Sequence, residues 1–234
     1  MKEVNTMRQP TGWEAAYRKR PSGGYGTASE HEDCGRLHEI FRGNRVRRVL
    51  DLGCGDGRHL VHFARRGYVM CGQDIAPTAI QLAREWLAKE GLPADLAVGD
   101  MPRVLWPDCT FDAMLCVQII NHHRIREIRQ TVAEIHRVLR PGGYLFLTVQ
   151  TDRRPPGPDA PKSVEVEPDT YVPLAGHEKG VPHHEFDMRE LLDELRDFRL
   201  CEELMPVHKD SLGYTCLLAE EPEKTQPRAR LASQ

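Results

Sequence analysis

Long hydrophobic runs are missing from this sequence of 234 residues. No apolar stretch approaches the ~20 residues that a membrane-spanning helix needs, and Met1–Pro10 has no hydrophobic segment of the kind found in secretory signals. Hydrophobic residues still make up 40% of the chain, which is enough to fill the core of one domain. The sequence therefore predicts a soluble, cytoplasmic protein with no membrane partner.

A surplus of positive charge is also missing. Lysine and arginine total 32 against 35 aspartates and glutamates, and the net charge is −3. General nucleic-acid binders carry a basic surplus, so the balance predicts against a nucleic-acid partner. We interpret two local clusters as solvated surface at the ends of elements: Arg42, Arg45, Arg47 and Arg48, and then Arg124, Arg126 and Arg129.

Paired cysteine motifs are absent too. The seven cysteines are odd in number and none has C-x-x-C spacing. Cys71, Cys116 and Cys216 lie in apolar runs, where a cysteine behaves as a small hydrophobic residue. This usage is typical of a reducing compartment and argues against a disulfide framework.

What the chain does contain is an alternation of strand and helix patterns. This rhythm predicts an α/β, Rossmann-like doubly wound sheet built from right-handed crossovers. The predicted strands are Arg48–Leu52, Tyr68–Gln73, Asp95–Val98, Phe111–Ile120 and Tyr144–Val149, with helices at Arg58–Arg66, Ala76–Glu90 and Arg124–Leu139 between them.

The organisation predicts one domain over residues 1–220 and a disordered tail over 221–234. Residues 1–44 form N-terminal cap helices (Thr11–Tyr17 and Ser29–Phe41), and 45–150 form the core. Residues 151–186, rich in Pro, Gly and charge, read as an inserted lid with a weak strand at Thr170–Leu174. Residues 187–220 add a closing helix at Glu190–Leu195 and a hairpin of Phe198–Val207 with Tyr214–Ala219.

The segment Val49–Gly57 ends the first predicted strand in a glycine-spaced turn. Glycines stand at 53, 55 and 57, but the dinucleotide spacing G-x-G-x-x-G fails because its last position is Arg58. Phosphate cradles favour exposed N–H groups and basic partners, whereas this turn offers carboxylates. The pattern therefore favours a ligand with a positive centre, S-adenosylmethionine, over NAD or ATP.

Acidic residues follow three strands in succession. Asp51 precedes the first glycine, Asp74 ends the second strand, and Asp100 with Met101 follows the third. Ligands of open α/β sheets bind beyond the carboxyl ends of the strands. We expect Asp51 to orient the turn, Asp74 to accept both hydroxyls of a ribose, and Asp100 to contact an adenine packed on Met101.

These residues together resemble a class I S-adenosylmethionine-dependent methyltransferase of the small-molecule type. The matching pieces are Val49–Gly57, Gly72–Ile75, Val98–Met101, Phe111–Met114 and Glu134–Gly143, so the resemblance is strong over 45–150 and weak over 185–220. It implies a seven-stranded, mostly parallel sheet with an antiparallel C-terminal edge hairpin, and makes 45–150 the donor-binding core.

The resemblance also implies site residues. Those at the donor are Gly53, Cys54, Gly55, Gly57, Asp51, Asp74, Ile75, Asp100, Met101, Gln118 and an N-terminal tyrosine, Tyr17 or Tyr25. The residues after the fourth strand line the reaction centre, here 118–122.

Eleven histidines supply the candidates for proton transfer. His122 and His123 follow the fourth strand, and His183 and His184 end the lid. We expect His122, His123 or His184 as a general base, although each also fits as an ordinary polar loop residue. A metal site of His122, His183 or His184 with Glu185 lacks supporting helical spacing, so we predict no metal.

The sequence thus predicts methyl transfer from S-adenosylmethionine to a small soluble acceptor by in-line displacement. Two alternatives stay open: methylation of a macromolecule such as tRNA or a protein, and a binding protein without catalysis. A nucleotide-dependent oxidoreductase is disfavoured by Arg58. The acceptor depends on the lid and the histidines, since a fold does not set a substrate, and no pattern indicates an oligomeric state.

Overall fold

A mixed β-sheet forms the centre of the computed structural model, which describes residues 12–19, 29–152, 162–176 and 178–222. Five of its strands are parallel: β1 (Arg48–Leu52), β2 (Val69–Asp74), β3 (Ala94–Val98), β4 (Phe111–Val117) and β5 (Leu139–Val149). β11 (Thr215–Glu220) runs antiparallel to β5, and β10 (His208–Lys209) pairs with β11. The order is β10-β11-β5-β4-β1-β2-β3, with β9 (Arg199–Leu200) also paired to β11. The predicted seven-stranded, mostly parallel sheet with an antiparallel edge hairpin is confirmed.

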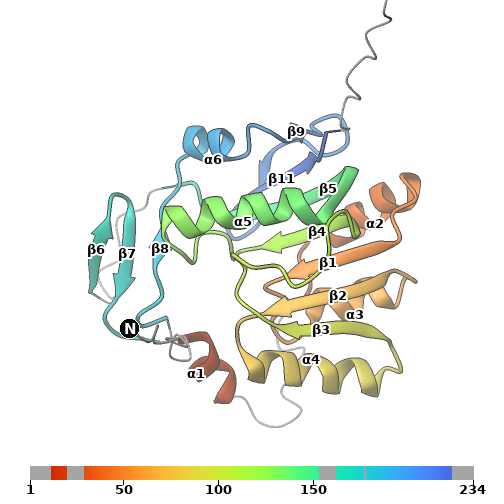
Figure 1. Cartoon of the computed structure of the whole chain (residues 1–234), viewed down its shortest axis with the longest axis horizontal. Coiled ribbons are helices and arrows are strands. Elements are labelled where there is room, and N and C mark those ends of the chain that lie inside the picture. Colours follow the sequence, from red (N-terminus) through yellow and green to blue (C-terminus); the bar gives the residue numbers. More distant parts are fainter. Residues whose placement is uncertain (1–11, 20–28, 153–161, 177, 223–234) are drawn as a thin grey trace, which may run out of the picture.

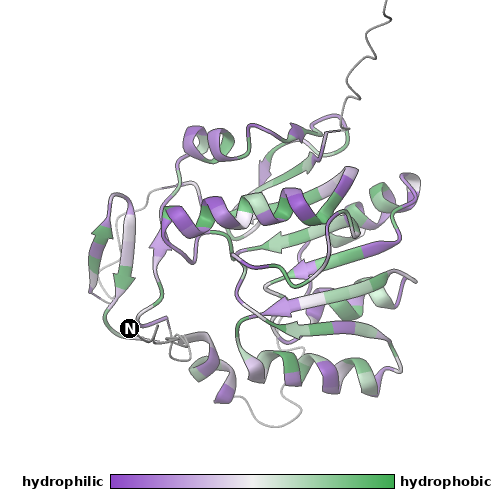
Figure 2. Cartoon of the chain, in the orientation of Figure 1, coloured by the Kyte–Doolittle hydropathy of each residue, from purple (hydrophilic) through white to green (hydrophobic). Residues whose placement is uncertain are grey.

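Helices cover both faces of this sheet (Figure 1). The two covering sets are α2 (Cys34–Gly43), α3 (Arg58–Ala64) and α4 (Pro77–Lys89), and α5 (Ile125–Val138) with α6 (Met188–Glu194). Val49 packs with the first set and Leu50 with the second, because successive strand residues face opposite sides. Strands buried on both faces explain the continuous apolar runs. Figure 2 shows the complementary pattern on α5, where hydrophobic and hydrophilic residues alternate.

The chain reverses its direction of travel across the sheet between β1 and β4. From β1 it builds outward through β2 and β3, and then crosses back to β4 on the other side of β1. The carboxyl ends of β1 and β4 therefore border a crevice, the usual ligand position in such sheets. Within the ranges described, no helix is long and apolar enough to cross a membrane.

The lid, residues 151–186, contains a small antiparallel sheet of its own. β6 (Ser163–Glu167), β7 (Thr170–Pro173) and β8 (His183–His184) pair in that order. Figure 1 places this sheet beyond the carboxyl ends of the parallel strands. Glu167 anchors it, since its Oε1 accepts the backbone N–H of Ile125 at 2.7 Å. The carboxylate thereby caps α5, whose own N-cap residue Arg124 makes no side-chain cap.

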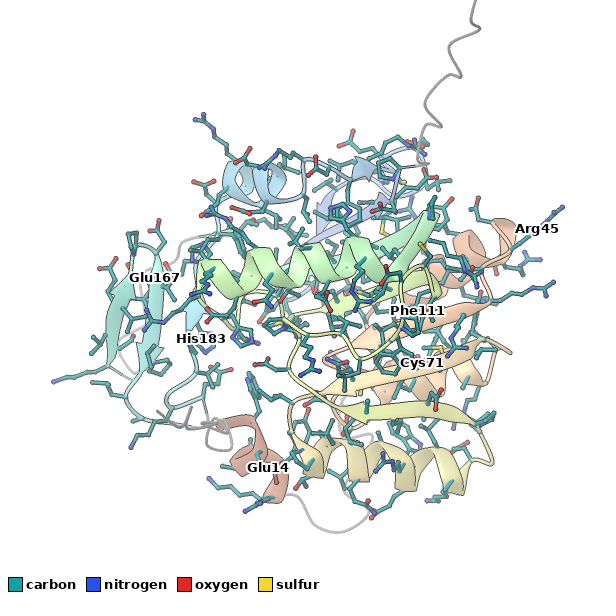
Figure 3. The ribbon with its side chains drawn as sticks, viewed as in Figure 1. Glu14, Arg45, Cys71, Phe111, Glu167 and His183 are labelled. Carbon is teal, nitrogen blue, oxygen red and sulfur yellow. The ribbon has the colours of Figure 1, made fainter. Side chains whose placement is uncertain are left out.

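α1 (Gly12–Arg18) docks in a similar way on the other side of the crevice. Glu14 is 3% exposed; its carboxylate accepts the backbone N–H of Thr78 at 3.0 Å and the Thr78 hydroxyl at 2.7 Å. Thr78 lies in the first turn of α4, where Ala76 supplies no side-chain cap. Figure 3 shows Glu14 beside the start of α4. Two carboxylates thus fasten the two walls of the crevice to helix N-termini.

Several predicted elements have other bounds in the structure; the strand expected at Phe111–Ile120, for example, ends at Val117. The helix expected at Ser29–Phe41 begins only at Cys34, after a turn in which His31 Nδ1 accepts the N–H of Asp33. The helix expected to reach Leu139 ends at Val138, and β5 begins at once because Leu139 pairs with Phe111.

The predicted closing strand Phe198–Val207 is wrong for most of its length. Only β9 lies within that range, and β10 begins just beyond it. Cys201 and Met205 are both fully buried, and the N–H of Met205 bonds the carbonyl of Cys201 at 2.8 Å. A turn that buries two side chains four positions apart is therefore present where a strand, with alternate side chains buried, was predicted. Tail residues 223–234 lie outside the described part of the chain.

Gln73 at the end of β2 joins two loops of the crevice, so we predict a large stability loss for Gln73→Leu. The side chain is 0% exposed. Its Nε2 donates to the carbonyls of Asp100 and Arg103, each at 3.0 Å, and its Oε1 accepts the N–H of Leu105 at 3.0 Å. Leucine of similar shape leaves three backbone groups unpaired, and we expect the free energy of unfolding in urea to fall by about 3 kcal/mol.

Gln81→Leu is the matched control. Gln81 is exposed on α4, and within the described ranges its side chain bonds Glu85, so its replacement is expected to change the free energy of unfolding by less than about 0.5 kcal/mol. Equal losses in the two variants would contradict the role of Gln73.

Candidate functional site

The glycine loop, residues 53–57, turns sharply at the carboxyl end of β1. Its first two N–H groups donate to the carbonyl of Gln73, Gly53 at 2.7 Å and Cys54 at 3.1 Å. Gly53 and Gly55 have φ of +72° and +54°, a region that L side chains rarely occupy. A Cβ at Gly53 would lie 2.6 Å from Ile119 Cγ2, and one at Gly55 would lie 2.5 Å from the Tyr17 hydroxyl. The loop therefore presents bare backbone to the space above it.

That space is a cavity of about 680 Å³ at the carboxyl ends of the strands. Small-molecule sites are typically roughly 300–1,000 Å³. The cavity brings together most of the predicted residues: Tyr17, Gly53, Cys54, Gly55, Asp74, Ile75, Asp100, Met101, Gln118, His122 and His123. α1 and the lid turn close it, through Trp13 and Lys179–Pro182.

Asp74 lies between the glycine loop and the start of α4. Its Oδ2 accepts the N–H of Gly55 and its Oδ1 accepts the N–H of Ala76, both at 2.9 Å. Burial raises the pKa of this carboxyl to about 6, although the two N–H bonds act in the opposite direction. Each oxygen of an ionised carboxylate accepts two hydrogen bonds, so two acceptor positions remain beside the cavity.

Asp100 lies at the far end of the cavity, next to His123. Its Oδ1 accepts the N–H of Met101 at 2.9 Å and lies 2.7 Å from His123 Nε2. His123 is 6% exposed. The structure thus pairs this predicted base with a predicted adenine contact.

Asp51 lies beneath the glycine loop and does not line the cavity. It is 1% exposed; its Oδ2 accepts no hydrogen bond in the described part of the chain and lies 3.6 Å from His59 Nδ1. An uncompensated buried carboxylate favours a positive charge nearby. Its position fits the predicted role of orienting the loop from behind.

The predicted histidines lie in three different environments. His122 faces the cavity, with its ring centroid 5.0 Å from that of Trp13. Burial, then the neighbouring charges of His183 and His123, lower the pKa of His122 to about 3, so its ring is neutral. His184 is 3% exposed and outside the cavity lining; its Nδ1 lies 2.8 Å from the Thr170 hydroxyl and its Nε2 lies 3.1 Å from Glu190 Oε1.

Gly57, another predicted residue, is not part of the cavity wall. Gly57 precedes α3 and faces Ala83, with 3.1 Å between its ideal Cβ position and the Ala83 Cβ. Tyr25 lies outside the described residues. Among the described residues, those predicted for the donor therefore line one cavity, except for Gly57 and the buried Asp51.

Sequence reasoning missed several wall residues. Trp13 lines the cavity although it is not among the residues predicted for the site, as do Gln73, His59 and the lid turn Lys179–Pro182. Trp13 lies four residues from the candidate Tyr17, a spacing that puts both side chains on one face of a helix. Trp106, by contrast, packs in the core against Phe111.

Side chains that can bind a metal come together in two places among the described residues. His122, Glu178 and His183 form one group, and His31, Asp33 and Cys216 form the other; within each group the ligand atoms lie within 4.8 Å of one another. The group weighed from the sequence used Glu185, whereas the structure puts Glu178 in that position. All seven cysteines are free, and burial raises the pKa of the Cys54 thiol in the glycine loop.

Comparison with known proteins matches residues 49–143 to the family described as a methyltransferase domain. Demethylmenaquinone methyltransferase of Deinococcus radiodurans is 34% identical over 103 residues, which are 43% of this chain and 42% of that protein. This chain therefore matches less than half the length of that curated relative.

Two solved structures share the fold over most of this chain. A crystal structure of the PH0226 protein from Pyrococcus horikoshii has a TM-score of 0.68 at 22% identity, covering 88% of this chain and 98% of that one. The 1,6-didemethyltoxoflavin-N1-methyltransferase of Burkholderia thailandensis, solved with S-adenosylhomocysteine, has a TM-score of 0.63 at 17% identity, covering 91% and 88%. Residues 49–143 of this chain therefore match the methyltransferase domain family, and the fold is the one found in these two solved structures.

Proposed function

We propose that this protein transfers a methyl group from S-adenosylmethionine to a small acceptor bound between the glycine loop and the lid. The observation that carries the proposal is the cavity over the glycine loop, whose wall brings together Asp74, Asp100, His122 and the lid turn. The named enzymes among the relatives support a small acceptor, since their titles refer to demethylmenaquinone and to 1,6-didemethyltoxoflavin.

The residues around the glycine loop suit S-adenosylmethionine, the methyl donor of the family. The glycine loop lines the cavity with backbone, since a Cβ at Gly53 or Gly55 would clash with Ile119 or Tyr17. The two remaining acceptor positions on Asp74 match the two hydroxyls of a ribose. Ile75 and Met101 offer apolar contact for an adenine, Asp100 offers an acceptor for its amino group, and Gln118 borders the same space.

When bound, the donor supplies an electrophilic methyl group on a positively charged sulfur. The chain's own contribution is placement: Tyr17 and Trp13 on α1 and the lid turn surround the acceptor side and restrict water. Holding two reactants in line can supply roughly 7–11 kcal/mol of a barrier. Of the three histidines expected as a base, only His122 both faces the cavity and lies outside the pairings that engage His123 and His184.

The direct test combines calorimetry with a turnover screen. We expect S-adenosylmethionine and S-adenosylhomocysteine to bind, and expect S-adenosylhomocysteine to form when small hydroxyl, amine or thiol compounds are added. Turnover with bulk tRNA or protein alone would favour the macromolecular alternative. If S-adenosylmethionine binds but no turnover occurs with small molecules, tRNA or protein, a non-catalytic binding protein would be favoured.

Donor affinity is predicted to depend on Asp74. Asp74→Ala removes the acceptor positions for the ribose, and we expect S-adenosylhomocysteine to bind at least about tenfold more weakly in calorimetry, as for a lost hydrogen bond to a charged group. Asp95→Ala, an exposed carboxylate on β3, is the matched control and should bind normally. Undiminished affinity in Asp74→Ala would refute the donor assignment.

The pH dependence of binding follows from the raised pKa of Asp74, about 6 in the free protein. Ribose hydroxyls donate to the ionised carboxylate, so affinity is present above pH 6 and falls as the group is protonated below it. Between pH 7 and pH 5 we expect the Kd of S-adenosylhomocysteine to rise roughly tenfold, in proportion to the loss of the ionised form. Asp74→Asn should bind weakly with a nearly flat profile, and an equally steep profile in that variant would assign the titration to another group.

Docking of α1 is predicted to matter for affinity and little for the fold. Glu14→Ala removes the bonds to Thr78, which frees the helix that carries Trp13 and Tyr17 into the cavity. We expect S-adenosylhomocysteine to bind about tenfold more weakly, with the main thermal transition retained because α1 lies outside the core of the sheet. Glu39→Ala, which breaks an exposed ion pair with Arg42 on α2, should bind as the parent does.

A further inference from the structure

Three side chains that suit a metal ion meet where the lid touches the acceptor side of the cavity. They are His122, from the turn after β4, and Glu178 and His183, both from the lid. The ring centroids of His122 and His183 are 4.9 Å apart, edge to face, and His183 Nε2 lies 3.6 Å from Glu178 Oε2. All three side chains are half-buried. The cluster therefore joins two segments that are far apart in the sequence.

The fold fixes His183 through its neighbour His184. In β8, Tyr171 pairs with His183 and Thr170 with His184. His184 is held between Thr170 and Glu190, and its N–H bonds the carbonyl of Asn121 at 2.8 Å. Because successive strand residues face opposite sides, a buried His184 directs His183 the other way. Figure 3 shows His183 on the side of the lid that faces the central strands.

Glu178 and His122 are placed by their own turns. The N–H of Val181 bonds the carbonyl of Glu178 at 3.0 Å, and the N–H of Gly180 bonds that of Pro173 at 3.0 Å. The N–H of His122 bonds the carbonyl of Ile119 at 3.0 Å. His122 and Lys179–Pro182 line the cavity, so the open side of the cluster borders the acceptor space.

The ligand types indicate a particular class of ion. Two imidazoles and one carboxylate suit Zn²⁺ and related divalent first-row metals, and three protein ligands leave a position open for water or substrate. In tetrahedral geometry, zinc bonds of about 2.0–2.1 Å place the ligand atoms about 3.4 Å apart. The observed distance between His183 Nε2 and Glu178 Oε2 is 3.6 Å.

We propose that His122, His183 and Glu178 bind a divalent transition-metal ion whose open position faces the acceptor end of the cavity. On the basis of the proposed function, the acceptor is a molecule with a hydroxyl or thiol that coordinates this ion. Coordination releases the acceptor proton to water. The oxygen or sulfur lone pair then forms the bond to the methyl carbon, the carbon–sulfur electron pair of the donor stays on sulfur, and neutral S-adenosylhomocysteine leaves.

The second cluster is a poorer candidate for this role. His31, Asp33 and Cys216 are buried, and none of them lines the cavity. His31 Nε2 already lies 3.0 Å from Asp210 Oδ2, and Asp33 Oδ2 lies 3.0 Å from His208 Nε2. An ion held there would offer no position to an acceptor.

The test is metal binding by the donor-free protein, with Zn²⁺ in calorimetry and Co²⁺ as a spectroscopic probe. We expect one tight site per chain, with visible Co²⁺ absorption typical of four-coordination by nitrogen and oxygen. His183→Gln and Glu178→Gln should each weaken Zn²⁺ binding by at least about tenfold. Glu165→Gln, an exposed glutamate of β6 in the same lid, is the matched control and should bind as the parent does. Thermal melting verifies that each variant folds.

Cys216→Ser separates the two clusters. Retained Zn²⁺ binding in this variant supports the proposal, whereas lost binding, or a thiolate-to-Co²⁺ charge-transfer band in the parent, assigns the ion to the buried cluster and overturns it. Absence of Zn²⁺ binding in the parent also overturns it. S-adenosylhomocysteine affinity, measured on the same samples, distinguishes the two proposals: donor binding without Zn²⁺ refutes only the metal site, and Zn²⁺ without donor binding refutes only the methyltransferase function.

Discussion

The end of β2 is the constraint on which the crevice depends. The backbone carbonyl of Gln73 accepts both leading N–H groups of the glycine loop, and its side chain holds the loop that follows β3. Its neighbour Asp74 bonds Gly55 and the start of α4. Two adjacent residues thus fix three segments around one cavity. Because these groups are buried and most partners are backbone, the geometry is set before a ligand arrives.

Both walls of the cavity are attached in the same way, by a glutamate that bonds the first turn of a helix. Glu14 of α1 bonds the first turn of α4, and Glu167 of the lid bonds the first turn of α5. In each case the helix lacks a side-chain cap of its own, and a carboxylate from a distant segment satisfies a free N–H. The favourable interaction of negative charge with helix N-termini supports both contacts. The covering elements are thereby held to the sheet at points next to the ligand space.

In the two histidine pairs, His122–His123 and His183–His184, local geometry gives the two neighbours different surroundings. In each pair one ring is engaged in the protein, His123 with Asp100 and His184 with Thr170 and Glu190. The other ring, His122 or His183, belongs to the group with Glu178, and His122 lines the cavity. Strand alternation separates His183 from His184, and the turn after β4 separates His122 from His123. Adjacent identical residues consequently have different chemistry available to them.

The sequence by itself determined the core fold and which residues meet at the carboxyl ends of the strands, because both depend on local signals. Apolar runs, glycine spacing and carboxylates at strand ends are read within a few residues, and the carboxyl ends of parallel strands must meet at one edge. Only the tertiary structure decided the acceptor side. Trp13, Glu178 and the orientation of His183 depend on how α1 and the lid dock, through contacts such as Glu14 with Thr78 that join residues 64 positions apart. A turn likewise replaced the expected strand at Cys201–Met205, because burial of both side chains outweighed local β propensity. Such long-range contacts produce no periodic pattern in the sequence, since each partner alone is an ordinary polar or aromatic residue.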